Sequence, residues 1–184
     1  MNHYIDIKIL PDPEFKTNVL LNALFAKFHR ALVSLNQGEI GISFPAFKHS
    51  LGNVLRLHGT QENLDILMNS QWVAGLNDYC NVSKILTVPE TAEHIIVKRV
   101  QAKSNAFRLR RRSIVKGWVT AEQAIARIPL AKEKTLKLPF LQLKSHSTGQ
   151  HFRLFIEHGQ PRPQPTSGSF SSYGLSAKST VPWF

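Results

Sequence analysis

Residues 3–35 read HYIDIKILPDPEFKTNVLLNALFAKFHRALVSL, and this segment sets the architecture of the N-terminal half. Ile5, Ile7 and Ile9 alternate with polar residues, which predicts a strand with one buried face. Asp12, with a proline after it, predicts a helix start, because its carboxylate can cap a first turn in which proline is tolerated. Apolar residues then recur at helical spacing. They are Leu21, Leu24, Phe25, Phe28, Leu32 and Leu35.

The predicted elements up to residue 92 follow the order strand, helix, strand, strand, helix, strand. Further strands are expected over 40–44, 54–58 and 82–88, and Thr60 can cap the second helix. This is the order of the ferredoxin-like βαββαβ plan, which RNA-recognition domains share. We therefore predict an α+β protein in which residues 1–92 form a ferredoxin-like, RNA-recognition-like domain.

Residues 93–184 are predicted to form a second, basic α+β domain. A strand over 95–101 leads into an arginine-rich helix and a second short helix, and segments 140–144 and 150–157 predict a β-hairpin. The C-terminal VPWF, residues 181–184, is expected to dock into the core.

Charge separates the two halves of the chain. The first 93 residues carry 7 basic and 9 acidic side chains, whereas the remainder carries 16 basic and 3 acidic ones. No acidic residue lies between His94 and Ala121. Because clustered like charges repel one another, this distribution predicts a polyanionic partner, with nucleic acid as the first candidate.

The basic helix is predicted to have a cationic face beside an apolar edge. At about 100° per residue, four cations fall within an arc of roughly 140°. They are Arg108, Arg111, Arg112 and Lys116. Phe107, Ile114 and Trp118 cluster beside them, and we expect these three to anchor the helix in the protein.

Composition excludes several classes of protein. Cys80 is the only cysteine, so neither an intrachain disulfide nor a cysteine-based metal site can form. The N-terminus lacks the apolar core of a signal peptide, and no apolar stretch approaches the ~18 residues of a membrane span. We expect a cytoplasmic protein without a membrane partner.

His29 is the candidate for proton transfer. Its position at the edge of the apolar helix face favours, taken by itself, a boundary histidine without a special role. An imidazole can nevertheless accept or donate a proton at neutral pH, and RNA carries its own nucleophile in the 2′-OH. Metal-dependent cleavage would need several converging carboxylates, which the basic half lacks, so we expect neither metal nor cofactor.

Two further pairs of residues suggest contacts with bases. Arg99 and Gln101 lie two apart on the predicted strand, hence on one face, and their side chains suit guanine and adenine. An ordinary solvated strand face is an equal alternative. Phe152 and Phe155 fall on opposite faces of their strand, which suits one buried ring and one that stacks on a base.

Short motifs throughout the chain carry a more specific resemblance. They are HYIDI (3–7), FAKFHRALV (25–33), RVQAKSN (99–105), RLRRR (108–112), Ser145, STGQHFRLFI (147–156), YGLS (173–176) and VPWF (181–184). In this order they resemble the CRISPR-associated endoribonucleases of type I-F systems, which cut precursor CRISPR RNA within its repeats. One departure is Val115 and Lys116, where the family's helix tends to carry arginines.

The resemblance implies catalytic roles. His29 would be the general base or proton shuttle at the scissile 2′-OH, and Ser145 would orient that hydroxyl. Tyr173 would help position the histidine and the phosphate region. The products would be a 2′,3′-cyclic phosphate and a 5′-OH, formed without a metal.

The resemblance also implies RNA contacts and partners. Arg99 and Gln101 would recognise base pairs at the foot of the repeat hairpin, and Phe152 would stack beneath the last pair. The remaining RNA-binding residues would be Lys103, Arg108, Arg111, Arg112 and Lys116. The enzyme would stay bound to its product within an RNA-guided surveillance complex. Two alternatives remain open, a non-catalytic RNA-hairpin-binding subunit and a DNA-binding architectural protein.

Overall fold

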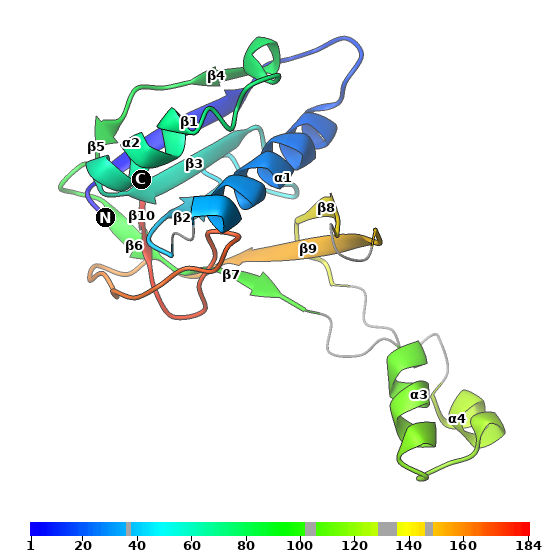
Figure 1. Cartoon of the computed structure of the whole chain (residues 1–184). Helices are drawn as coiled ribbons and strands as arrows, with labels where there is room; N and C mark the ends of the chain where they lie inside the picture. The colour runs from blue at the N-terminus through cyan, green and yellow to red at the C-terminus, as the bar shows by residue number, and fades with distance from the viewer. Residues whose placement is uncertain (36–37, 102–105, 129–135, 146–148) are drawn as a thin grey trace. The chain divides into compact units, whose positions relative to one another are not determined.

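The computed structural model describes residues 1–35, 38–101, 106–128, 136–145 and 149–184 (Figure 1). The protein is mixed α+β with several antiparallel sheets, which confirms the predicted α+β class. It divides into a larger unit, Met1–Val100 with Leu138–Phe184, and a smaller unit, Gln101–Lys137. The division into domains 1–92 and 93–184 stays a prediction.

The main sheet of the larger unit is antiparallel, with the order β2-β3-β1-β4. Its strands are β1 (His3–Ile9), β2 (Gly41–Ser43), β3 (Val54–Gly59) and β4 (Cys80–Val82), and β5 (Leu86–Thr87) also pairs with β1. The single strand predicted over 82–88 is therefore replaced by two short ones. A 3-10 turn, η1 (Asn77–Tyr79), precedes β4.

Helices α1 (Thr17–Leu35) and α2 (Gln61–Asn69) pack on this sheet. The predicted apolar residues of α1 are buried from Leu21 to Leu32, and the predicted cap of α2 is present, since the Thr60 side chain accepts from the Asn63 N–H. The predicted start of α1 at Asp12 is wrong. The Asp12 carboxylate instead accepts the N–H groups of Glu14 and Phe15, at 2.9 and 2.8 Å, and so closes a separate turn before the helix.

A second antiparallel sheet has the order β7-β9-β8 and contains the predicted hairpin. Its strands are β7 (Val97–Val100), β8 (Phe140–Lys144) and β9 (His151–His158). Figure 1 shows β8 next to α1, which it contacts. The strand predicted over 95–101 is divided between β6 (Glu93–Ile95) and β7, and it ends before Gln101.

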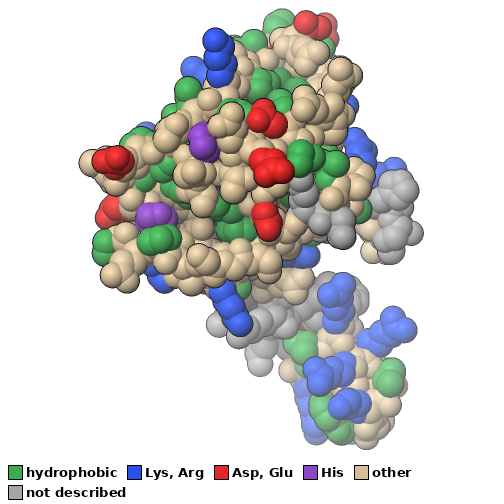
Figure 2. All heavy atoms as spheres, turned by 60° about the vertical axis from the view of Figure 1, so that its left-hand side comes forward, with side chains coloured by type: hydrophobic (Ala, Val, Ile, Leu, Met, Phe, Trp, Pro, Cys, Tyr) green, Lys and Arg blue, Asp and Glu red, His purple; other side chains and the backbone are tan. Residues whose placement is uncertain are grey.

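The smaller unit contains α3 (Ala106–Val115) and α4 (Ala121–Arg127). Basic side chains gather on this helical unit, in the lower part of the view in Figure 2. Within this unit the side chains of Ile114 and Trp118 are 40% and 63% exposed, the side chain of Phe107 lies outside the described residues, and the expected anchoring stays a prediction. A polar contact joins the two helices: Arg110 donates from Nε and Nη2 to the carbonyl of Ile128, at 2.9 and 2.7 Å.

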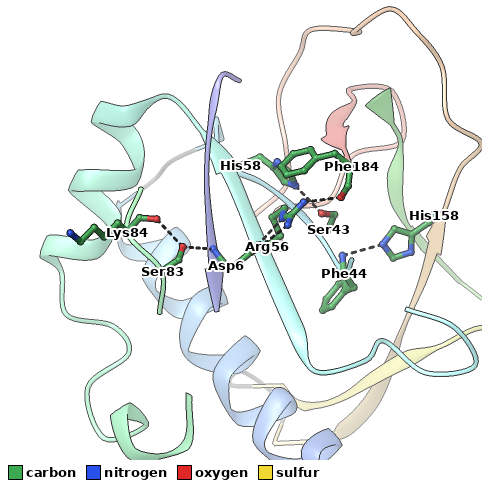
Figure 3. A network of polar contacts seen from close by, with 9 residues as sticks. All are labelled: Asp6, Ser43, Phe44, Arg56, His58, Ser83, Lys84, His158 and Phe184. Carbon is green, nitrogen blue, oxygen red and sulfur yellow. Dashed lines mark hydrogen bonds and ion pairs between the residues drawn. The ribbon is translucent and has the colours of Figure 1, made fainter. Parts of the chain in front are cut away.

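The C-terminus docks as predicted, because β10 (Val181–Trp183) pairs with β6. Arg56 of β3 holds the last residue in the network shown in Figure 3. Its guanidinium forms two hydrogen bonds with the Asp6 carboxylate, donates to the Phe184 oxygen at 3.1 Å, and lies 4.0 Å from the centre of the Phe184 ring. None of the described helices has the length and apolar character that a membrane-spanning segment needs.

Candidate active site and basic helix

A cavity of about 860 Å³ in the larger unit gathers several of the predicted site residues. His29 from α1, Ser145 at the end of β8, and Tyr173 from the segment before β10 all line it, together with Phe152 of β9. The three residues predicted to be catalytic therefore share one cavity, although they lie far apart in the sequence.

The imidazole of His29 has a defined orientation and a defined tautomer. His29 lies at the edge of the buried face of α1 and is half-buried itself. Its Nδ1 is 2.8 Å from the carbonyl oxygen of Ser172. A carbonyl oxygen can only accept, so Nδ1 must carry the proton in this hydrogen bond. In the neutral ring, Nε2 then keeps its lone pair and can act as a base.

Tyr173 fixes the plane of the histidine ring. The two rings stack with their centroids 4.1 Å apart and 9° between their planes. Tyr173 sits in a turn that Gly174 closes with a φ of 68°, and the Gly174 carbonyl accepts from the Ile42 N–H at 3.0 Å. A Cβ at Gly174 would lie 2.8 Å from the Ile42 side chain. The turn is thus held tightly against β2, and with it Tyr173.

Ser145 is positioned by the hairpin. Its N–H donates to the Gln150 carbonyl at 2.8 Å, and its own carbonyl accepts from the Gly149 N–H at 2.9 Å. Gly149 has a φ of 66°, a backbone conformation that favours glycine. These contacts place Ser145 at the cavity wall; residues 146–148 lie outside the described residues.

Arg99 lies beside two aromatic residues of the cavity. Its guanidinium carbon is 5.8 Å from the centre of the Phe152 ring and 5.9 Å from that of Tyr173. Phe155 is on the opposite face of the sheet from Phe152, as predicted, and packs on another aromatic ring. The prediction that Arg99 and Gln101 lie on one face of the same strand is wrong, because β7 ends at Val100, before Gln101.

The predicted cationic residues of the helix are exposed in the smaller unit. They are Arg108, Arg111, Arg112 and Lys116. The ammonium of Lys116 lies 5.2 Å from the centre of the Trp118 ring, within the range of a cation–π contact. Lys103 lies outside the described residues. Gln101 is exposed and belongs to the same smaller unit.

Two cations of the cavity were missed by the sequence argument. Arg30 and Lys144 line the cavity and are exposed. Each directly adjoins a predicted catalytic residue in the chain, and this adjacency was the available signal. Within the described part of the chain, no three His, Cys, Asp or Glu side chains group together so that they could hold a metal ion.

The fold and cavity define an α+β protein in which a hydrogen-bonded histidine lies in a cavity that cations and aromatic rings also line. Residues 4–184 match the family described as "CRISPR-associated protein (Cas_Csy4)". The chain is 52% identical over 184 residues to the CRISPR-associated endonuclease Cas6/Csy4 of Escherichia coli (strain UTI89 / UPEC), and the match covers all of both chains. It is 44% identical over 187 residues to the protein of that name from Pseudomonas aeruginosa (strain UCBPP-PA14), again over both whole chains. The chain therefore belongs to the Cas6/Csy4 family of CRISPR-associated endonucleases, which confirms the predicted family.

Proposed function

We propose that this protein is a metal-independent endoribonuclease that cleaves CRISPR repeat RNA at the foot of its stem-loop. The observation that carries the proposal is His29, whose Nδ1 is bonded to a backbone carbonyl and whose ring is stacked in a cavity that Ser145 also lines. The names of the related proteins support endonuclease chemistry in the CRISPR context.

In the proposed reaction, Nε2 of His29 accepts the proton of the 2′-OH, which Ser145 orients. The 2′-oxygen attacks the adjacent phosphorus, and the bond from phosphorus to the 5′-oxygen breaks. A 2′,3′-cyclic phosphate remains on one fragment, and the 5′-oxygen takes up a proton on the other. RNA supplies the nucleophile itself, so the protein needs only a base, an oriented hydroxyl and nearby positive charge.

The proposed RNA contacts follow from the position and chemistry of the cations. Arg99 and Phe152, which adjoin each other in the larger unit, would bind the foot of the hairpin. Gln101 would take part in base recognition, and Lys103 would bind nearby backbone. The exposed helix residues Arg108, Arg111, Arg112 and Lys116 would bind the phosphates of the stem, because contacts between cations and phosphates supply much of the affinity for nucleic acid.

We further propose that residues 1–92 form a ferredoxin-like domain. The antiparallel order β2-β3-β1-β4, with the chain order strand, helix, strand, strand, helix, strand, supports this assignment. The protein would act in the cytoplasm, remain on its product and join a type I-F surveillance complex.

The decisive experiment compares cleavage with binding in His29→Ala. We expect single-turnover cleavage of the repeat hairpin to fall at least about 10²-fold, the lower range for a lost proton-transfer group, with unchanged affinity for the uncleaved hairpin. A variant that cuts at the wild-type rate would contradict the assignment. If wild-type protein binds the hairpin tightly but never cuts it, the protein is a non-catalytic RNA-binding subunit instead.

A further inference from the structure

Arg30 and Lys144 place two positive charges beside the reacting groups. Arg30 follows His29 on α1, Lys144 precedes Ser145 at the end of β8, and both line the cavity. No Asp or Glu occurs among the described residues that line it. Since no lining carboxylate neutralises them there, these two cations face the cavity as a site for negative charge.

The cavity extends along α1 on both sides of His29. It is lined from Ala26 to Ser34, a separation of eight residues, which corresponds to about 12 Å of helix. A volume of about 860 Å³ lies near the upper end of the range of about 300–1,000 Å³ for sites that enclose small ligands. The cavity is therefore larger than a single phosphate linkage requires.

We propose that Arg30 and Lys144 form a subsite for the phosphates of the RNA strand on the 3′ side of the cut, the strand that leaves with the 5′-OH. This inference rests on the proposed function. In the proposed function, Arg99 and Phe152 bind the foot of the hairpin, which the protein retains after cleavage. Arg99 is therefore the cation near the cavity that serves the stem. Arg30 and Lys144, next to His29 and Ser145, are then the cations that can bind the fragment on the 3′ side of the cut.

The two side chains suit a partner of variable sequence. A lysine ammonium is a point charge on a flexible stem, and an exposed arginine can follow a phosphate in several geometries. Phosphate contacts of this kind position a strand without recognising its bases. The subsite would thus increase the rate at which substrates with a downstream strand are captured, while affinity for the retained product would not depend on it.

The test uses two RNAs with the same repeat hairpin, one ending a single nucleotide past the cut and the other with a long single-stranded 3′ extension. The single-turnover rate constant is measured at subsaturating enzyme, where it reports kcat/KM, for wild type, Arg30→Gln, Lys144→Gln and the double variant. Lys48→Gln, which changes an exposed cation that is not among the residues lining the cavity, is the matched control. Binding of the cleaved hairpin reports whether each variant is folded.

We expect wild type and Lys48→Gln to cut the extended RNA faster than the short one. Each cavity variant should lose much of that advantage at low salt, and the log–log salt slope of the advantage should fall by about 0.7 for each single-strand phosphate contact that is removed. Product binding should not change, and each variant should slow the short RNA by less than it slows the extended RNA. Equal losses on both RNAs, or no loss on either, would overturn the subsite while leaving the proposed function intact. Failure of wild type to cut either RNA would instead overturn the proposed function and this inference with it.

Discussion

The rings of His29 and Tyr173 stack nearly parallel, 4.1 Å apart, while Nδ1 of the histidine is held by the carbonyl of the residue before the tyrosine. The two consecutive residues Ser172 and Tyr173 thus fix both the plane of the imidazole and the direction in which its Nδ1 points. The contact is purely tertiary, since the hydrogen bond joins residues 143 positions apart. It leaves Nε2 as the nitrogen available to a substrate.

Stacking on Tyr173 predicts that its ring matters more than its hydroxyl. Tyr173→Phe should retain single-turnover cleavage within about threefold, whereas Tyr173→Ala should lose about 10²-fold, the scale expected for a misplaced catalytic group. Affinity for a hairpin with a 2′-deoxy substitution at the cut should be the same in both variants. A Phe variant as slow as the Ala variant would show that the hydroxyl takes part in the reaction.

Metal removal should leave cleavage intact. In the proposed reaction the nucleophile belongs to RNA and the base is an imidazole, so no step requires a metal-bound water. We expect the same cleavage rate with excess EDTA as with added Mg²⁺, measured beside a metal-dependent ribonuclease as the control. Strong inhibition by EDTA that Mg²⁺ reverses would contradict the proposed mechanism.

Arg112 and Arg110 form a matched pair for testing the basic helix. Arg112→Gln should lower the log–log salt slope of hairpin binding by about 0.7 to 0.9, because one phosphate contact is lost, without changing the melting temperature. Arg110→Gln should destabilise the contact between α3 and α4, by about 1 kcal/mol for each hydrogen bond to the Ile128 carbonyl. Hydrogen exchange of these helices would measure that loss. An unchanged salt slope in Arg112→Gln would mean that this arginine does not contact RNA.

The buried His58 and the partly buried His158 predict a loss of stability in acid. Burial lowers the pKa of His158 to about 4, and burial, with the charge of Arg56, lowers the pKa of His58 well below its ordinary value. The unfolded chain therefore binds more protons than the folded one below the ordinary histidine pKa of about 6.5. The stabilisation is present above that pH and is lost as the pH falls towards 4.

Urea unfolding at several pH values would measure this dependence. We expect the free energy of unfolding to fall between pH 6.5 and 4 by an amount on the order of 3 kcal/mol for His158. His158→Gln keeps a side chain that can accept from the Phe44 N–H, which the histidine binds at 3.2 Å, but it cannot titrate. Its stability should depend less on pH. A curve as steep as that of wild type would assign the acid sensitivity to other groups.

Local features of the fold were predictable because they depend on neighbours in the chain. The alternation in β1, the apolar face of α1 and the cap at Thr60 all rest on contacts within a few residues. The start of α1 was not predictable from the same signals. Asp12 closes a separate turn, and Phe15 after it packs edge-on against Tyr79, with ring centres 5.9 Å apart, a partner that no local pattern identifies.

The sequence by itself determined the class, the family and the identity of the candidate residues, since periodicity, charge and motif order are all written along the chain. Only the tertiary structure decided how those residues combine. It brought His29, Ser145 and Tyr173 to one cavity and assigned the proton of His29 to Nδ1. It also added Arg30 and Lys144 to the cavity wall. Packing of distant segments sets these distances and directions, and no spacing in the sequence records them.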